Sequence, residues 1–230
     1  MTKHLDWIFA GLAVAAGVGL VRALRCEPTV RPGETMFLFG DSLAVGLDPF
    51  MRKLAQEKGV GYSSQSKGGT TMRQWLAQSG LQGAMAGAQA VFISLGTNDT
   101  YSSLTAEEMR QDAEKIVALA KGNGRRVLWI LPPTLPKEDR VSAEIRSTGV
   151  DVFESAKIDI PRPPTDLHPT GTGYALWSGL IWRQATCGNE QSPVATGAVP
   201  PPKRPVWLKR VPRPDGVRTI RAKRRDIPCA

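Results

Sequence analysis

The chain has 230 residues, 41% hydrophobic and 22% charged, which supports one sizeable core with tails but not two full domains. With two histidines and three cysteines, a three-histidine zinc site, a cysteine-rich zinc module and a dense disulfide scaffold are all excluded. The net charge is +9, but residues 188–230 carry +7 of it and residues 1–187 only +2, so the body is not predicted to bind nucleic acid.

The N-terminal segment, residues 1–30, predicts membrane targeting. Residues 7–21 contain no charge, Lys3 precedes them, and Arg22 and Arg25 follow. This run matches the apolar part of a secretory signal and is short for a membrane span, which needs about 20 residues. Two alternatives stay open: cleavage near Val21, with export of the body, or an uncleaved anchor with the body in the cytoplasm. We expect a membrane-associated or exported protein, periplasmic or extracellular if bacterial.

The body, residues 33–187, alternates apolar strands with helices. A capping box at Thr105 and Glu108 opens the clearest helix, which ends near Gly122. This alternation predicts a parallel sheet with helices on both faces, a three-layer α/β/α sandwich. The expected strands are 36–39, 60–64, 90–95, 127–131 and 150–153, and the expected helices are 49–58, 105–120, 137–147 and 172–184.

Polar motifs follow these strands, where parallel sheets place their functional groups. Ser42 comes directly after the first strand, where a serine is well positioned to be a nucleophile, and His168 is available as its base. The backbone N–H groups of Ser42 and Gly69 and the side-chain amide of Asn98 are candidate donors to an oxyanion. An acidic residue beside the histidine would fix its tautomer.

These motifs resemble the SGNH hydrolase family, also called GDSL esterases and lipases. The matching blocks are Phe39-Gly40-Asp41-Ser42-Leu43, Gly69, Gly96-Thr97-Asn98-Asp99 and His168-Pro169-Thr170 followed by Gly173-Tyr174. The resemblance implies a flavodoxin-like fold and ester hydrolysis through an acyl-enzyme, without a cofactor. It makes Ser42 the nucleophile, His168 the base, and Ser42, Gly69 and Asn98 the oxyanion hole. The implied substrate is a small acyl ester, such as an O-acetyl glycan or a lysophospholipid.

The acid of the triad departs from the family pattern. The family places it three residues before the histidine, where this chain has Thr165, and the nearest acid is Asp166. We take Asp166 as the third catalytic residue; a backbone carbonyl or Asp159 are the alternatives. Because of this shift, a second hypothesis stays open: a non-catalytic adaptor that keeps the fold and acts through its tail.

Other motifs are weaker. Ser64-Gln65-Ser66-Lys67 spells S-x-x-K, but Gly68 and Gly69 follow where a helix should begin. The α/β-hydrolase pattern G-x-S-x-G fails at Ala44. Taken singly, Ser42 is equally consistent with a helix cap and the other motifs with ordinary turns.

The tail, residues 188–230, contains eight prolines and few apolar residues, so we expect it to be disordered or extended. It is either a solvated linker or an electrostatic attachment to an anionic membrane, a wall polymer or nucleic acid. Cys187 and Cys229 can pair in an exported protein, and Cys26 is the other possible partner.

Overall fold

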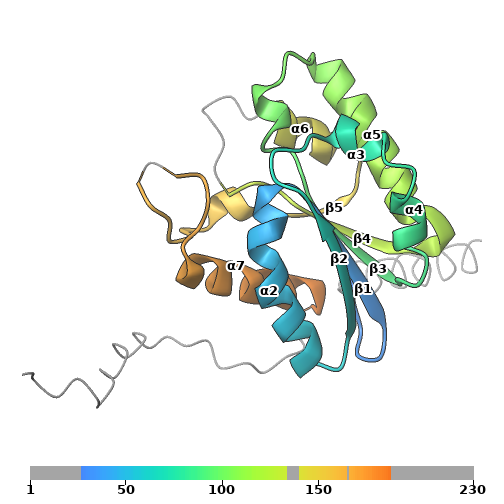
Figure 1. Ribbon diagram of the computed structural model, residues 1–230, viewed down its shortest axis with the longest axis vertical. Coiled ribbons are helices and arrows are strands. Elements are labelled where there is room, and N and C mark those ends of the chain that lie inside the picture. The colour runs from blue at the N-terminus through green and yellow to red at the C-terminus, as the bar shows by residue number, and fades with distance from the viewer. Residues whose placement is uncertain (1–26, 134–139, 165, 188–230) are drawn as a thin grey trace, which may run out of the picture. The chain divides into compact units, whose positions relative to one another are not determined.

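The sheet of this protein has five parallel strands in the order β2-β1-β3-β4-β5 (Figure 1). The structure is a computed structural model that describes residues 27–133, 140–164 and 166–187. The predictions for residues 1–26 and for the tail therefore lie outside the described residues. The strands lie within two residues of those expected: β1 Thr35–Gly40, β2 Gly61–Ser66, β3 Ala90–Ser94, β4 Arg126–Ile130 and β5 Asp151–Phe153.

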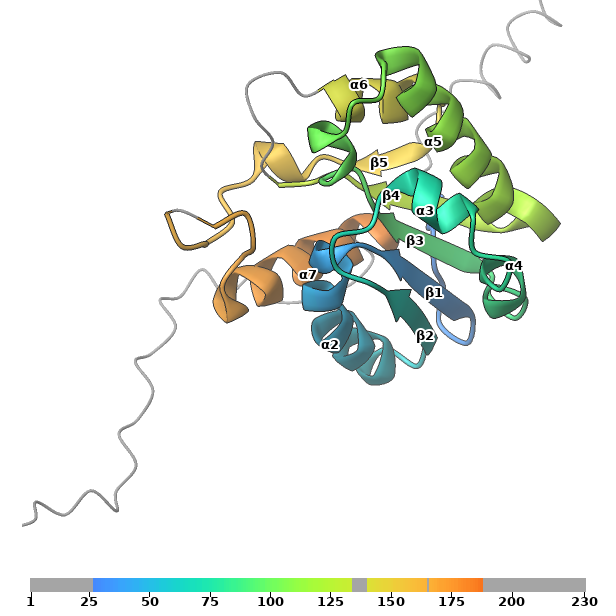
Figure 2. The ribbon, with the colours of Figure 1, turned by 45° about the horizontal axis from the view of Figure 1, so that its top comes forward.

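Helices cover both faces of the sheet, which confirms the predicted α/β class (Figure 2). Phe37 and Phe39 of β1 are buried against the layer of α3 to α6, whereas Met36 and Leu38 are buried against α2 and α7. Burial on both faces explains why the strand is apolar throughout. The helices are α2 Ser42–Glu57, α3 Met72–Leu76, α4 Leu81–Ala84, α5 Ala106–Lys121, α6 Arg140–Ser147 and α7 Gly171–Ala185; short 3₁₀ turns, η1 to η3, cover Asp99–Tyr101, Gly122–Gly124 and Ser155–Lys157.

Helix α2 begins at Ser42, and the prediction of a start at Pro49 was wrong. Asp41 caps this helix, because its carboxylate accepts a hydrogen bond of 2.9 Å from the N–H of Leu43. Pro49 lies inside the helix and has no N–H for the carbonyl of Val45. Val45 is 47% exposed, so water can satisfy that carbonyl. An exposed proline therefore did not stop a helix with a strong cap.

The edge strand β2 is held to α2 by a polar cluster. Tyr62 donates a hydrogen bond of 2.9 Å to Asp48, Ser64 also donates to Asp48, and Arg52 lies 3.2 Å from the same carboxylate. These hydrogen bonds outweigh burial and keep the pKa of Asp48 below its usual value. The polar composition of β2, which made its prediction weak, therefore serves its contact with α2.

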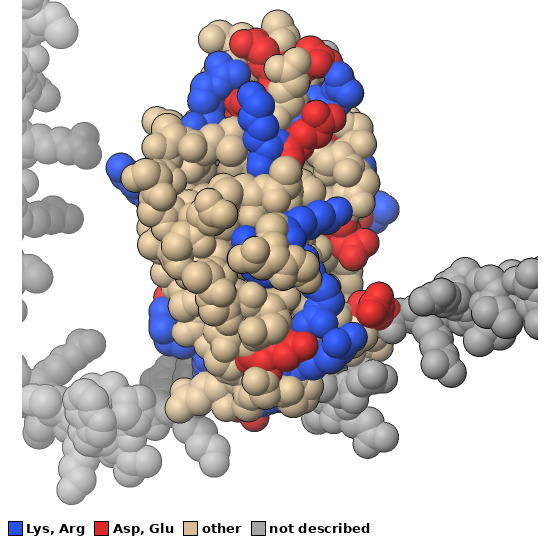
Figure 3. Space-filling model, turned by 90° about the vertical axis from the view of Figure 1, so that its right-hand side faces the viewer, with Lys and Arg blue, Asp and Glu red and all other residues tan. Residues whose placement is uncertain are grey.

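Helix α5 has the expected capping box, with Thr105 accepting from the N–H of Glu108 and Glu108 accepting from that of Thr105. The short helices α3 and α4 were not predicted. The molecular face in Figure 3 carries basic and acidic side chains interspersed, without a block of one sign. Within the described ranges, no helix is long and apolar enough to cross a membrane.

Candidate active site

Ser42 is positioned by the close packing of β1 against β3. A Cβ on Gly40 would lie 2.0 Å from the carbonyl oxygen of Ser94, so only glycine fits at this crossing. The next N–H, that of Asp41, donates to the same carbonyl at 3.0 Å. With the Asp41 cap on α2, these contacts leave Ser42 in the first helical turn, at the carboxyl end of a central strand and partly exposed.

His168 lies on the loop between η3 and α7. The N–H of Thr170 donates to the carbonyl of Pro161 at 2.9 Å, which closes the loop, and the Thr170 hydroxyl accepts from the N–H of Gly173, which caps α7. A Cβ on Gly173 would lie 2.1 Å from the Pro161 oxygen, so this glycine is required by the packing. The loop closure therefore fixes the chain just after His168.

The three residues predicted as the catalytic triad lie together. His168 Nε2 lies 2.8 Å from Ser42 Oγ, and His168 Nδ1 lies 2.7 Å from Asp166 Oδ1. With the proton on Nδ1, the ring donates to Asp166 and Nε2 accepts from the serine hydroxyl. A hydrogen-bond chain of this kind can activate a serine for nucleophilic attack.

The displaced acid reaches the histidine through a local turn. Asp166 Oδ1 also accepts a hydrogen bond of 2.9 Å from the backbone N–H of His168, so an Asx turn aims the carboxylate at the ring. This backbone hydrogen bond, followed by the one from the ring, holds the pKa of Asp166 below its usual value. The side chains of His168 and Asp166 are 44% and 50% exposed. The partner of His168 Nδ1 is Asp166, and not the alternative, Asp159. Thr165 lies outside the described residues.

The predicted oxyanion donors come from loops that contact the segment around Ser42. Within the part of the chain that the structure describes, no carbonyl or side chain accepts from the N–H of Ser42 or of Gly69. Gly69 has φ +74°, and a Cβ on the neighbouring Gly68 would lie 3.7 Å from Ser42 Cβ. The Asn98 amide nitrogen donates to the carbonyl of Thr70 at 3.0 Å and lies 3.4 Å from Asp41 Oδ2. Because the contact between the Asn98 amide and Asp41 is long, the amide hydrogen that points to Asp41 is only weakly hydrogen-bonded.

Two buried carboxyl groups lie behind these donors. Asp99 accepts from the N–H of Met72 at 3.1 Å, which ties the loop after β2 to the loop after β3. Burial raises the pKa of Asp41 to about 6 and that of Asp99 to about 6, and the negative charge of Asp99 adds to the shift at Asp41. The sequence motifs contained both residues, but nothing in their spacing indicated that they would be buried.

Two further residues that the sequence did not assign hold the same loop. Trp75 Nε1 donates to the hydroxyl of Thr70 at 2.9 Å, and that hydroxyl donates to the carbonyl of Lys67 at 2.7 Å. The Trp75 side chain is buried. The signal that could have found its hydrogen bond is that a buried indole N–H needs an acceptor.

Tyr174, from the last motif, packs across the first turns of α2. A Cβ on Gly46 would lie 2.0 Å from Tyr174 Cζ, so the glycine makes room for the ring. Burial, and then the charges of Asp41 and Asp166, raise the pKa of Tyr174 to about 12. Across residues 27–133, 140–164 and 166–187, no three potential metal ligands come together.

Comparisons with known proteins show the family and the fold. The model of the GDSL-like lipase/acylhydrolase family matches residues 38–176, more than half of the chain. A search of curated proteins found no match. Solved structures with the same fold include a lipase/acylhydrolase from Enterococcus faecalis, with 22% identity and a TM-score of 0.52 over 66% of this chain and 94% of that one. An acetylxylan esterase from Geobacillus stearothermophilus has 16% identity and a TM-score of 0.55 over 68% and 96%.

A GDSL-like lipase from Bacteroides thetaiotaomicron is similar at 18% identity and a TM-score of 0.52, covering 71% of this chain and 92% of that one. At these identities the structures establish the fold, and the family match establishes the kind of enzyme. The chain therefore belongs to the GDSL-like lipase/acylhydrolase family of ester hydrolases.

Proposed function

We propose that this protein is a serine esterase in which Ser42 is the nucleophile, His168 the general base and Asp166 the residue that orients the base. The observation that carries the proposal is the continuous chain of contacts from Ser42 Oγ through His168 to Asp166, at 2.8 and 2.7 Å. The proton of the hydroxyl passes to Nε2 as Oγ bonds to the ester carbonyl carbon. The Asp166 carboxylate stabilises the resulting imidazolium.

The acyl-enzyme then forms and is hydrolysed in balanced steps. As the tetrahedral intermediate collapses, the bond to the alcohol oxygen breaks and the imidazolium returns its proton to that oxygen. A water molecule attacks the acyl-serine, gives its proton to His168, and the acid product leaves as Ser42 regains its hydrogen. The oxyanion of both intermediates is placed among the N–H groups of Ser42 and Gly69 and the Asn98 amide.

In this proposal the weak contact of Asn98 with Asp41 is exchanged for one with the oxyanion. The bond to the Thr70 carbonyl at 3.0 Å keeps the amide oriented, while the 3.4 Å contact to Asp41 leaves its other hydrogen to the intermediate. Such preorganised donors are worth about 10² to 10³ in turnover at comparable sites.

The substrate that we propose is a small acyl ester, with the acetyl group of a glycan as the leading case and a lysophospholipid as the other. Support for acetyl comes from the similar fold of the acetylxylan esterase, and support for a lipid from the neighbours named lipases. An acetyl group needs little space beside the nucleophile, and Gly68, which lies close to Ser42, has no side chain there.

We further propose that the enzyme is exported or membrane-associated and that its basic tail contacts an anionic membrane or wall polymer. Cys187 is disulfide-bonded, and disulfides persist mainly in oxidising compartments. The apolar N-terminal run and the +7 tail point the same way, although both lie outside the described residues.

The decisive assay is hydrolysis of p-nitrophenyl acetate by the full chain and by Ser42→Ala and His168→Ala. We expect turnover to vanish with Ser42→Ala and to fall by orders of magnitude with His168→Ala. Ser102→Ala, which changes the serine directly after the η1 turn, is the matched control and should retain activity. If the wild type is no faster than Ser42→Ala, the adaptor hypothesis replaces the esterase proposal. The next measurement is then binding of the tail to anionic polymers.

A further inference from the structure

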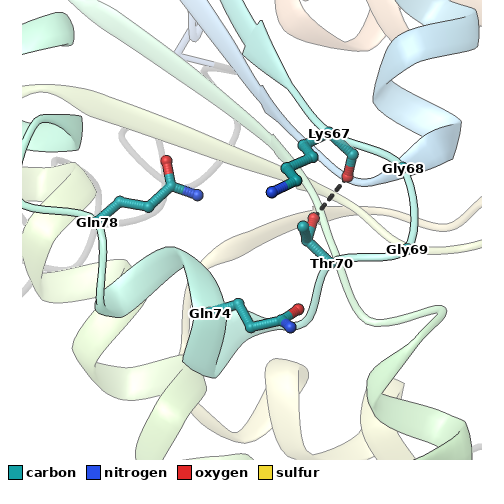
Figure 4. Close-up of a pocket in the computed structure, with 6 residues that line it drawn as sticks. All are labelled: Lys67, Gly68, Gly69, Thr70, Gln74 and Gln78. Atoms are coloured by element: carbon teal, nitrogen blue, oxygen red, sulfur yellow. Dashed lines mark hydrogen bonds between the residues drawn. The ribbon is translucent and has the colours of Figure 1, made fainter.

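A polar pocket is lined by the loop that contacts the nucleophile, and it has no assigned role. It has a volume of about 370 Å³ and is lined by Lys67, Gly68, Gly69, Thr70, Gln74 and Gln78. Figure 4 shows the ends of Lys67 and Gln78 facing one another across it. Its two lining glycines belong to the loop that lies against Ser42, where a Cβ on Gly68 would be 3.7 Å from Ser42 Cβ. The pocket and the nucleophile therefore share this loop.

The pocket wall is fixed in place. The N–H of Lys67 donates to the carbonyl of Gly40 at 3.0 Å, and the carbonyl of Thr70 accepts from Asn98 at 3.0 Å. Each end of the lining loop is thus bonded to a residue beside the nucleophile. A group held in the pocket is held relative to the reacting atoms, which is the requirement for a specificity subsite.

The charge of Lys67 is unpaired. Among the described residues, no carboxylate lies within ion-pair distance of its ammonium. The neighbouring Arg73 differs, because it pairs with Asp112 at 2.9 Å and with Glu108 at 3.7 Å. The ammonium of Lys67 is therefore available to a ligand, whereas the charge of Arg73 is neutralised by its two carboxylate partners.

The other polar groups of the pocket are mainly spare donors. Gln74 uses its amide oxygen to accept from the N–H of Thr71 at 2.9 Å, which leaves its NH₂ group. The Thr70 hydroxyl is already engaged as donor and acceptor. The Gln78 amide has no hydrogen-bond partner in the described part of the chain. An ammonium with two amide NH₂ groups suits an anion, which only accepts hydrogen bonds.

We propose that this pocket binds an anionic substituent, a carboxylate or a phosphate, on the alcohol side of the ester substrate. The inference rests on the proposed function of Ser42 and adds the substrate class: acyl esters of acidic alcohols. Lys67 supplies the charge, and Gln74 and Gln78 supply the hydrogen bonds. The interaction acts on recognition and leaves the chemistry at Ser42 unchanged.

The test compares charged and neutral esters that differ only at the anion. The first substrates are 4-acetoxybenzoate and its methyl ester. The second pair, 3-acetoxybenzoate and its methyl ester, places the carboxylate at another distance from the reacting ester. A further charged substrate is 4-acetoxyphenyl phosphate. For each enzyme we take the ratio of kcat/KM for the charged ester to that for the neutral one. Dividing the wild-type ratio by that of Lys67→Gln cancels the intrinsic reactivity of the esters.

We expect this double ratio to be about threefold to tenfold for at least one charged ester, and to shrink toward one in 0.5 M salt. Lys67→Glu should lower kcat/KM for the charged ester further, while hydrolysis of the methyl ester persists. Lys115→Gln, which removes an exposed lysine on α5 outside the pocket, is the matched control and should leave the ratio unchanged. The carboxylate and phosphate arms show which anion is preferred.

A binding measurement separates this inference from the esterase proposal. Ser42→Ala protein, with and without Lys67→Gln, is titrated calorimetrically with the charged and neutral esters. Tighter binding of a charged ester that depends on Lys67 supports the subsite even if turnover proves independent of Ser42. A double ratio of one for every charged ester, together with equal affinities in the titration, overturns it.

Discussion

The buried carboxyl of Asp41 gives a stability prediction whose sign can be worked out. Its side chain is fully buried, and burial raises its pKa from an ordinary 3.8 to about 6. Asp41→Asn keeps an oxygen to cap α2 at Leu43 but cannot ionise. The variant therefore resembles the wild type with a protonated Asp41 at every pH.

The direction follows from proton uptake. Between pH 3.8 and 6 the folded wild type holds more protons at Asp41 than the unfolded chain does, so its free energy of unfolding falls as pH rises through this window. The difference between the two pKa values corresponds to a loss of roughly 3 kcal/mol, complete near pH 7. About 1 kcal/mol of this loss falls between pH 5 and pH 7.

The assay is urea unfolding of the wild type and Asp41→Asn at pH 5, 6, 7 and 8. We expect the stability of the variant relative to the wild type to increase from pH 5 to pH 7 and then to level off. A difference that does not depend on pH, or that decreases as pH rises, would refute the assignment of a raised pKa to this carboxyl. Thermal unfolding in the same buffers provides a check that the two-state assumption holds.

Three further perturbations have outcomes set by particular contacts. Asp166→Ala should lower kcat by about ten- to a hundredfold, less than the roughly 10⁴ known for a buried triad acid, because Asp166 is half exposed and water can replace it; steady-state kinetics decides this. Gly46→Ala should lower the free energy of unfolding by about 1–3 kcal/mol, because its methyl group would meet the Tyr174 ring at 2.0 Å, and the effect should shrink in a Tyr174→Leu background measured by urea unfolding. Trp75→Phe removes the 2.9 Å hydrogen bond to Thr70, so we expect a loss of about 1–3 kcal/mol with reduced kcat, and unchanged values of both would contradict its role in holding the loop.

The arrangement of the sheet was predictable because its signals are local. Strands β1, β3 and β4 are short apolar runs between turn residues, and Thr105 with Glu108 marks the start of α5. The start of α2 was missed because a cap at Asp41 and a proline at position 49 give opposing signals, and the exposed position of the proline decides the outcome. The short helix α3 has a local signal, the capping box of Thr71 and Gln74, which was not used in the prediction. Its hydrogen bond from Met72 to Asp99 is tertiary, and no local pattern contains it.

The site was predictable for the residues in motifs and not for those that support them. The positions of Ser42 and Asn98 after the ends of β1 and β3 follow from the parallel topology, and His168 lies on the loop before the last helix. Whether Asp166 could reach His168 depended on an Asx turn, which is decided by backbone geometry and not by residue spacing. The ion pairs of Arg73 with Glu108 and Asp112 depend on the packing of α3 against α5, which residue spacing does not show.

In the proposed mechanism, Ser42 is a nucleophile activated by His168. The most direct measurement is labelling of the full chain with a fluorophosphonate, followed by mass spectrometry of the peptide that contains Ser42. We predict one adduct on Ser42 in the folded wild type, strongly slowed labelling in His168→Ala, and none after denaturation. Labelling of another serine, or equal rates in the wild type and His168→Ala, would contradict the account.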